Sequence, residues 1–438
     1  MKPRFWFKGP LFWGCVIGIY LIGLGNGVLA GNATLNLKYD DLGPLILKQN
    51  GAVQSAALSI SAAQARKDFV KRARGPQLSG TVAGLGFQSG GGDGVRFQPE
   101  GSLDFILPIS RGVQDDVEEG IRQAQVGLAQ VQLTRTVAEE LSEAQDLYWE
   151  LVYSDEMGRN LEETLGQNAR SYASAKHRFK RGLLTQTDLL GFEIYKSQLE
   201  EGIESLHHEK KILLIRMNAV LGFSDGTVIG VSEKLLPHPH DQIVKESLSL
   251  DRSIEIEELT LGETIVSLQT DKIRGKSHPV IDLFATDALH SELDRSSSNW
   301  ADRTDVTIGI RGQFLFFDGN QIQSEVQSGL LKSKAHSAEL TYRKQRLTAE
   351  VKASQEELIH LHELFHHSES RLIQSKKFLQ STLQDYDRGI KDSTDVVTAM
   401  QLLQEVQGDY ATQKKQYQKI KTALLARFDL GYRNRVKE

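Results

Sequence analysis

The architecture of this chain follows from residues 178–190, which read Arg-Phe-Lys-Arg-Gly-Leu-Leu-Thr-Gln-Thr-Asp-Leu-Leu. A related stretch returns at residues 386–397 and reads Tyr-Asp-Arg-Gly-Ile-Lys-Asp-Ser-Thr-Asp-Val-Val. Each is a short break around a glycine inside a long helical pattern. Each also supplies a Thr-Asp pair as the N-cap and acidic first turn of the next helix. We therefore expect two tips of α-helical hairpins.

The interval between the two stretches indicates a tandem duplication. Gly182 and Gly389 are 207 positions apart, and so are Gly112 and Gly319, which follow predicted strands. Such a period is considered before the individual helices and strands, because it means that both copies have the same fold. The predicted organisation is a first repeat at residues 31–222, a connector at 223–250, a second repeat at 251–431 and a polar tail at 432–438.

Residues 1–30 have the layout of a secretory signal peptide. Three basic residues precede an apolar run, Leu11–Ala30, which ends in small residues. An uncleaved membrane anchor is the alternative, although five glycines weaken the run as a span. The only cysteine, Cys15, lies in this segment. A cleaved chain could therefore hold neither a disulfide nor a cysteine metal site.

The rest of the composition excludes several classes of protein. The net charge is −5 and no basic stripe stands out, so we expect no nucleic-acid partner. No later apolar run is long enough to cross a bilayer, which excludes a bundle of membrane-spanning helices. No Ser/His/Asp or paired-carboxylate arrangement is legible, so we expect neither catalysis nor a cofactor.

Alternating residues predict four β-strands, two in each repeat. In the first repeat an alternating segment pairs with Leu78–Phe87, and in the second a similar segment pairs with a strand that begins at Pro279-Val280. A long polar loop, His290–Arg303, is expected between the second pair. Period two gives each strand one apolar and one polar face. The apolar positions are Val95, Phe97, Leu103, Phe105, Leu107, Val306, Ile308, Ile310, Phe314 and Phe316.

Four strands of this length pose a closure problem if they enter a membrane. Roughly 9–11 tilted residues cross a bilayer, but about eight strands are the observed minimum for a barrel. Open edges in lipid would leave backbone groups unpaired at several kcal/mol each. Either the strands form a soluble sheet, or several chains pool them. Three chains would supply twelve strands, so a homotrimer is the leading membrane arrangement.

Long helices account for most of the remaining chain. The pattern after Gly112 runs for about 65 residues, or roughly 100 Å of helix. The return helix, Thr187–Leu221, is about half as long, and Val53–Arg74 could stack end-on to complete it. We therefore expect a mainly α fold with long coiled-coil hairpins and a β-barrel part. The second copy repeats the plan at Ile254–Lys276, Gln321–Asp387 and Asp395–Leu430.

Two constellations remain open to a functional interpretation. His362-Glu363-Leu-Phe-His366 matches the helical zinc-protease pattern. It has neither a third ligand nor a substrate cleft, so the polar face of a long helix is favoured and no metal is expected. Asp188 and Asp395 are most simply helix caps. If the hairpins close into a tube, they would instead ring its mouth, where carboxylates favour cations and salt links can hold a gate shut.

Together these features resemble the TolC-like outer membrane efflux proteins, the outer membrane factors of tripartite efflux and type I secretion systems. The export signal, the duplicated strand pair with its hairpin and both tip sequences carry the resemblance. The Leu-Gly pairs that end the return helices, Leu221-Gly222 and Leu430-Gly431, add to it. The resemblance covers almost the whole mature chain.

The resemblance implies a homotrimer in the outer membrane of a Gram-negative bacterium. Its strands would form one twelve-stranded barrel, and its helices would continue the barrel as a tunnel through the periplasm. The implied partners are outer-membrane lipid, a periplasmic adaptor (membrane fusion) protein and an inner-membrane efflux pump or ABC transporter. The channel itself would be passive.

The resemblance also implies two sets of site residues at the hairpin tips. The adaptor would dock on Gly182, Leu183 and Thr185 and on Gly389 and Ile390. Asp392 stands where the second copy should have threonine. Links between the hairpins would close a periplasmic gate, and Lys391 replaces the arginine that the family uses there. The gate positions are Asp188, Tyr386, Lys391 and Asp395.

A periplasmic adaptor is the alternative from another class. Such a protein would be anchored by Leu11–Ala30 and would use coiled-coil hairpins as a structural bridge. Adaptors carry one hairpin flanked by small β domains, whereas two duplicated hairpins with bilayer-length strands favour the channel.

Overall fold

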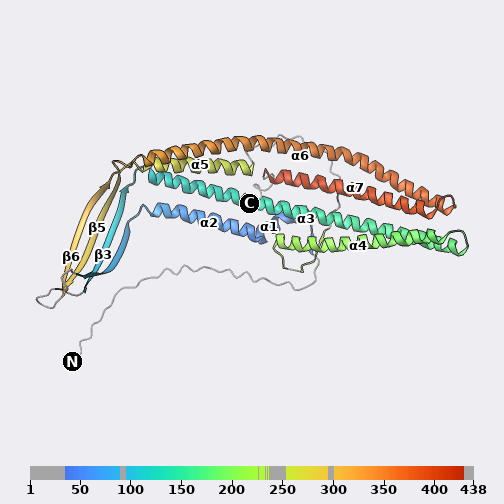
Figure 1. The fold of residues 1–438 in the computed structure, drawn as a ribbon, viewed down its shortest axis with the longest axis horizontal. Helices are drawn as coiled ribbons and strands as arrows, with labels where there is room; N and C mark the ends of the chain where they lie inside the picture. Colours follow the sequence, from blue (N-terminus) through green and yellow to red (C-terminus); the bar gives the residue numbers. More distant parts are fainter. Residues whose placement is uncertain are drawn as a thin grey trace, which may run out of the picture.

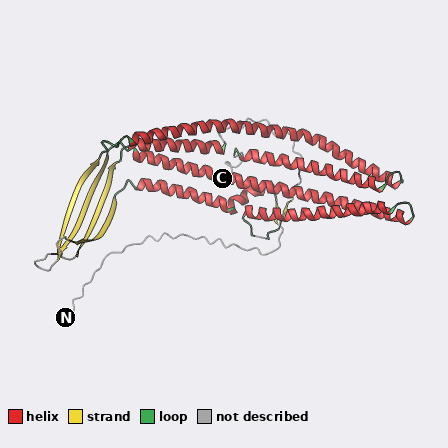
Figure 2. Ribbon diagram, viewed as in Figure 1, coloured by secondary structure: helices red, strands yellow, loops and turns green. Residues whose placement is uncertain are grey.

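Two long helical hairpins and one curved sheet make up the computed structural model, which describes residues 35–88, 95–224, 226–231, 233, 235, 253–293 and 300–428 (Figure 1, Figure 2). The sheet lies at one end of the elongated molecule and the hairpin tips lie at the other. The predicted signal peptide, Leu430-Gly431, the polar tail and most of the connector fall outside the described residues.

The hairpin helices recur at the 207-residue interval. The outgoing helices α3 and α6 each have 67 residues and begin 207 positions apart. The return helices α4 and α7 also begin 207 positions apart. The bounds are α3 Gln114–Lys180, α4 Gln186–Leu221, α6 Gln321–Asp387 and α7 Ser393–Ala426.

Shorter helices continue the line of each return helix, as expected. In the first repeat these are α1 (Leu42–Gln49) and α2 (Gly51–Arg72), and in the second α5 (Ile254–Gly275). Asn50 caps α2 by accepting from the Val53 amide at 3.0 Å, and its side-chain amide donates to the Val220 carbonyl of α4 at 2.8 Å. The Ile254 amide donates to the Arg427 carbonyl at 3.3 Å in the same way.

Four antiparallel strands form the main sheet in the order β2-β3-β5-β6. Their bounds are β2 Gln77–Gln88, β3 Val95–Ser110, β5 Val280–Leu293 and β6 Trp300–Gln313. The loop predicted at residues 290–303 is shorter than expected, because β5 and β6 both extend into it. The prediction that the strand reaches Phe314 and Phe316 is wrong. Gln313 pairs with Val280, where β5 begins after Pro279, so later residues have no strand beside them in the chain.

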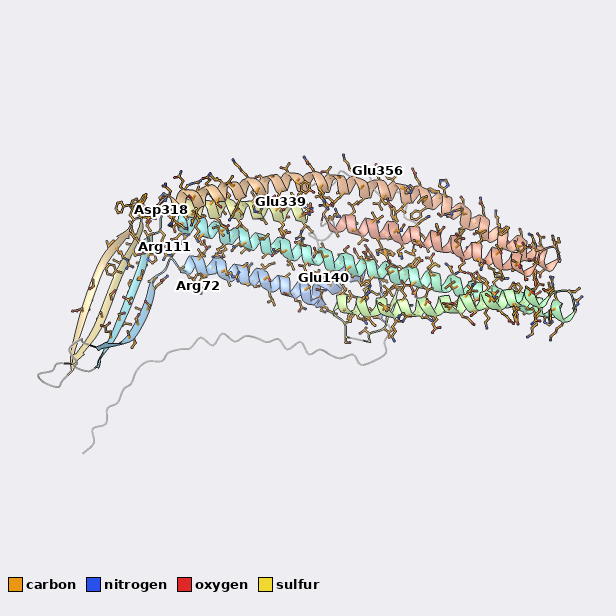
Figure 3. All side chains as sticks on the ribbon, viewed as in Figure 1. Arg72, Arg111, Glu140, Asp318, Glu339 and Glu356 are labelled. Atoms are coloured by element: carbon orange, nitrogen blue, oxygen red, sulfur yellow. The ribbon has the colours of Figure 1, made fainter. Side chains whose placement is uncertain are left out.

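Short connections near Arg111 and Asp318 join the strands to the long helices (Figure 3). The Asp318 carboxylate accepts from the Asn320 amide at 2.9 Å and from the Ile322 amide at 2.7 Å, which fixes the start of α6.

A second, parallel sheet joins β1 (Leu35–Leu37) to β4 (Ile229–Val231). The connector was expected to be irregular, but β4 lies within it. Three residues are too few to show a period of two, so the sequence pattern could not reveal this strand.

The apolar face of the main sheet is exposed. Val82 is 91% exposed, and Leu103, Val306, Ile308 and Ile310 are also exposed. On the opposite face, Asp104 accepts hydrogen bonds from Ser102 at 3.0 Å and from Thr286 at 2.8 Å. An apolar outer face combined with a polar inner face is the reverse of a soluble sheet and is typical of outer-membrane barrels.

The helices follow the same lateral order as the strands. At the sheet-proximal end α2 contacts α3, α3 contacts α5, and α5 contacts α6. Toward the tips α4 packs on α3, α3 on α7, and α7 on α6. The described chain is thus one curved layer with two open sides, one along β2, α2 and α4 and the other along β6 and α6 (Figure 1).

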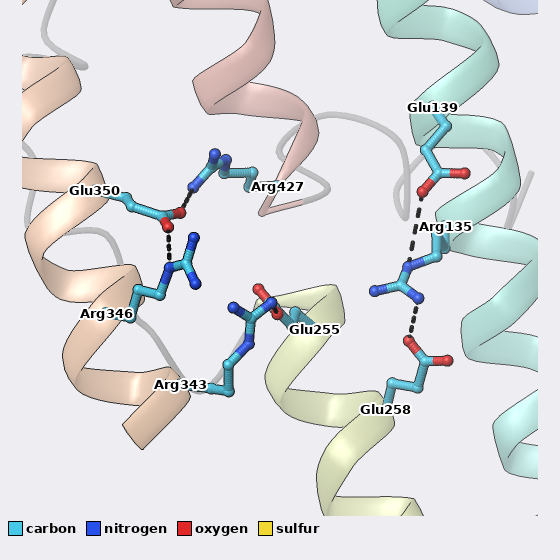
Figure 4. A network of polar contacts seen from close by, with 8 residues as sticks. All are labelled: Arg135, Glu139, Glu255, Glu258, Arg343, Arg346, Glu350 and Arg427. Atoms are coloured by element: carbon cyan, nitrogen blue, oxygen red, sulfur yellow. Dashed lines mark hydrogen bonds and ion pairs between the residues drawn. The ribbon is translucent and has the colours of Figure 1, made fainter. Parts of the chain in front are cut away.

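A band of charge crosses the middle of this layer, where α5 begins and α7 ends (Figure 4). Glu350 of α6 binds both Arg346, at 2.8 Å, and Arg427 of α7. Arg135 of α3 binds Glu258 of α5 at 2.7 Å. The groove beside these pairs has a volume of about 1050 Å³ and carries both signs of charge, so it selects for neither.

None of the described helices has the combination of length and apolarity that crossing a bilayer would need.

Candidate functional site: the hairpin tips

The two tips are built by the same local chemistry. Gly182 and Gly389 end the outgoing helices with φ of +71° and +78°, a left-handed conformation that disfavours side chains. Thr185 then caps α4 in a capping box with Asp188. Asp392 caps α7 in the same way, because its carboxylate accepts from the Asp395 amide at 2.9 Å. Aspartate therefore replaces threonine without loss of the cap.

Asp188 also joins the two hairpins. Ser393, at the start of α7, donates to Asp188 Oδ1 at 2.6 Å, while Thr185 donates to Oδ2 from both its amide and its hydroxyl. The hydrogen bond from Ser393, followed by those from Thr185, lowers the Asp188 pKa below its usual 3.8. The carboxylate is therefore charged at neutral pH.

Arg178 makes a second link between the hairpins. Its guanidinium donates to the Tyr386 carbonyl at 2.5 Å and to the Asp387 carbonyl at 2.6 Å. It also lies over the Tyr386 ring, 4.7 Å from the centroid. These carbonyls belong to the last turn of α6, where helix carbonyls lack intrahelical donors. Arg178 therefore caps one hairpin from the other, and we call the Arg178 and Ser393–Asp188 contacts the tip lock.

Tyr386 is part of the core beneath this lock. It is 1% exposed and its ring meets Phe192 of α4 edge-on, with centroids 6.2 Å apart. Burial is the main cause that raises the pKa of its hydroxyl. Within the described residues that hydroxyl has no hydrogen-bond partner.

Within the chain, Lys391 contacts its own hairpin. Its ammonium binds Asp395 at 3.1 Å, four residues ahead on its own hairpin, where the helical spacing brings the two together. That contact lowers the Asp395 pKa. Of the predicted gate residues, the structure joins Asp188 to the second hairpin, buries Tyr386 between the hairpins and keeps Lys391 with Asp395.

Sequence reasoning missed Arg178 and Ser393. Arg178 opens the first tip sequence, but nothing local indicates acceptors more than 200 positions away. Ser393 begins α7, and its role depends on the carboxylate of the other hairpin.

The predicted docking residues lie at the very ends of the hairpins. Leu183 is 62% exposed and Ile390 is 68% exposed. Gly182 and Gly389 have open space where a Cβ would lie. Thr185 is engaged in its cap, so its side chain is less available than expected.

The His362-Glu363-Leu-Phe-His366 segment lies on α6, with the two imidazole centroids 5.3 Å apart. Within the described ranges no group of three or more potential metal ligands gathers in one chain.

Two duplicated hairpins joined to one four-stranded sheet are the fold of this chain. The family model described as "Outer membrane efflux protein" matches residues 273–427. The prediction of a TolC-like outer membrane efflux protein is confirmed, by sequence for those residues and by fold for the described chain.

Solved structures give the same fold. The outer membrane protein VceC from Vibrio cholerae has a TM-score of 0.74 at 13% identity, covering 89% of this chain and 96% of its own. The CmeC outer membrane channel of Campylobacter jejuni has a TM-score of 0.75 at 14% identity, covering 91% and 88%. CusC has a TM-score of 0.75 at 15% identity, covering 92% and 95%. No curated protein sequence matches the chain significantly.

Proposed function

We propose that three copies of this chain close into one passive export duct through the outer membrane and the periplasm. An inner-membrane pump supplies the energy, and a periplasmic adaptor connects the pump to the hairpin tips. The observation that carries this proposal is the main sheet, because its apolar face is exposed and its two edges are open. In lipid such edges must be paired, and identical chains can pair them.

The open side of α6 supports closure by a second copy. Within the chain, α5 of the second repeat fills the groove of α3 of the first, and a Cβ at Gly120 would lie 3.5 Å from Leu268. The matching groove of α6 has a volume of about 490 Å³, and among the described residues it is lined by α6 alone. The helix that would fill this groove is α2 of the neighbouring subunit, the counterpart of α5. Both helices have 22 residues. The lining residues are Ser324, Gln327, Ser328, Leu331, Lys332 and Ala335.

Counterpart positions in this groove are matched in size. Gly120 corresponds to Gln327 at the 207-residue interval, and Leu268 corresponds to Ala65 at the 203-residue interval between α2 and α5. Within the chain the small Gly120 faces the large Leu268. Between subunits the large Gln327 would face the small Ala65. One rotation would relate each strand and each helix to its counterpart. Repeating a single rotation is how a heterologous interface closes into a ring.

Cysteines at these two positions should crosslink neighbouring subunits. Replacing Gln327→Cys and Ala65→Cys in the mature chain, which has no other thiol after signal cleavage, should give covalent dimers and trimers on non-reducing gels. Glu356→Cys paired with Ala65→Cys is the control, because Glu356 lies about 40 Å further along α6. A protein that stays a monomer by light scattering in detergent, with no crosslink, would contradict the trimer.

The exposed tips are the proposed docking surface for the adaptor. Leu183→Asp with Ile390→Asp should abolish export in cells, because both apolar side chains project from the hairpin ends. Conductance in planar bilayers should be unchanged, because neither residue takes part in the tip lock. Normal export by the double variant would contradict docking at this surface.

A further inference from the structure

Three lysines of α7 hold the two repeats together within the chain. Lys414 is 5% exposed and binds Glu156 of α3 at 2.8 Å. Lys415 binds Glu150 at 2.8 Å. Lys419 binds Glu150 at 3.2 Å and Asp146 at 3.9 Å. We call these contacts the intrachain seam; they supply three cations for three carboxylates.

Closure of the proposed trimer creates the same seam between subunits. The first hairpin meets the second through α3 and α7, so α6 of one subunit meets α4 of its neighbour. The uninterrupted 207-residue interval then identifies each counterpart. Lys414, Lys415 and Lys419 become His207, His208 and Ile212, while Glu156, Glu150 and Asp146 become Glu363, Glu357 and Ala353.

Contacts at the tips provide an independent check of this transposition. Arg178 lies 4.0 Å from the Asp387 carboxylate within one chain. The transposed pair is Asp385 with Lys180 of the partner subunit, which again joins opposite charges. Ser393 donating to Asp188 becomes Gln186 of the partner subunit facing Asp395, which again joins a donor to a carboxylate.

The seam between subunits lacks the cations that the intrachain seam has. At the positions of the three lysines, Glu357 and Glu363 have two imidazoles and an isoleucine, whereas Glu150 alone has two lysines. The nearest lysine on this face of α4 is Lys211, the counterpart of the buried Gln418. The two carboxylates and the two imidazoles are exposed in the single chain, as are Glu204 and Glu209 beside the histidines. This junction is therefore short of positive charge. Carboxylates brought together without cations repel each other.

We propose that each junction between subunits binds one divalent transition-metal ion of the zinc type, an inference that rests on the proposed trimer. The ligands are Glu357 and His360 of one subunit and His208 of the partner subunit. Lys415, the counterpart of His208, lies 4.0 Å from the ring centroid of Tyr153, whose counterpart is His360. The three donors therefore converge on one place.

The donor set and the spacing fit a metal ion. Glu357 and His360 form a Glu-x-x-His pair on one helix face, an arrangement that holds metals in helical bundles. Two imidazoles with one carboxylate suit zinc, with a fourth position left for water. An imidazole is shorter than a lysine side chain. His208 would therefore not reach Glu357 for a direct hydrogen bond. An ion with bonds of about 2.0–2.2 Å on both sides restores the span.

The test is metal binding by the detergent-solubilised trimer, purified through a tag without histidine and stripped with chelator. We expect one Zn²⁺ per subunit by calorimetry, a higher temperature of trimer dissociation with zinc, and a tetrahedral visible spectrum with Co²⁺. His208→Ala and His360→Ala should each abolish all three signals. His177→Ala is the control, because it lies in the last turn of α3, about 30 Å from the site.

Mixed trimers show whether the ligands come from different chains. A trimer assembled from His208→Ala and His360→Ala subunits retains one junction with every ligand, so zinc binding should partly return. Failure of the mixed trimers to bind zinc would overturn the proposal.

Three further outcomes also overturn the metal site. Zinc binding that is lost in His366→Ala but kept in His208→Ala would assign the ion to the His362–His366 pair. Stabilisation of the trimer by acid without metal uptake would assign the missing charge to protonated histidines. A stable trimer that binds no metal would overturn only the metal site, whereas a monomer would overturn the proposed function as well.

Discussion

Channels with Asp188→Ala and Arg178→Ala together should conduct severalfold more current in planar bilayers than the parent channel. The substitutions remove both contacts of the tip lock, namely the bond from Ser393 and the two bonds from Arg178 to helix α6. Hydrogen bonds to charged groups contribute about 1.5–3 kcal/mol. A loss of about 2 kcal/mol would favour the open tip by roughly 30-fold in each subunit.

Asp395→Ala separates this effect from simple loss of a helix cap. Asp395 has the same capping position as Asp188, but within the chain its carboxylate contacts Lys391 and Asp392 of its own hairpin. Asp395→Ala leaves both contacts of the tip lock in place, so we expect it alone to raise the conductance less than the double substitution does, and to reduce block by multivalent cations if the carboxylates ring the mouth. An Asp395→Ala channel that conducts as much as the double variant would contradict the tip lock.

The tip lock should also respond to strong acid. Hydrogen bonds lower the Asp188 pKa below 3.8, so the charged form stabilises the folded tip at and above that pH. This stabilisation is lost as the pH falls through the lowered value. Between neutral pH and about pH 5 Asp188 stays charged, so the conductance of the parent channel should not change with pH there and should rise only in stronger acid.

Gly222→Ala should destabilise the protein far more than Gly182→Ala, although both glycines have φ of +71°. A Cβ at Gly222 would lie 2.6 Å from the Gln49 carbonyl oxygen, while a Cβ at Gly182 would meet open space. The left-handed backbone alone costs an alanine about 1 kcal/mol. At Gly222 the end of α4 must also move away from the α1–α2 joint, which breaks the Asn50 bond to Val220.

Thermal unfolding followed by circular dichroism in detergent would measure the difference. We expect about 1 kcal/mol for Gly182→Ala and about 3 kcal/mol or more for Gly222→Ala. Similar melting temperatures for both variants would mean that the joint between α4 and α2 tolerates displacement and does not anchor the stack.

Local chemistry at the tips was readable from the sequence. Asp188 and Asp395 were predicted as caps, and both take part in capping boxes, but as the third helical residue and not as the cap itself. The caps are Thr185 and Asp392, so the predicted Thr-Asp caps at 187–188 and 394–395 were placed inside the helices. Within one chain Lys391 binds Asp395, because a carboxylate four residues away on the same hairpin competes for the ammonium, and the part of Lys391 in the gate stays a prediction. The end of β6 was misplaced because a strand ends where its partner ends, and the partner begins more than thirty residues earlier.

The 207-residue interval and the periods of two and about 3.6 were enough to establish two repeats, four strands and two long hairpins. The two short periods are visible in sequence because each is a short-range repeat of apolar residues, and the long interval is visible because the tip sequence recurs. Which carboxylate meets which cation was decided only by tertiary structure. The tip lock joins residues about 205–209 positions apart. Whether such residues meet depends on the packing of whole helices, which no local period encodes.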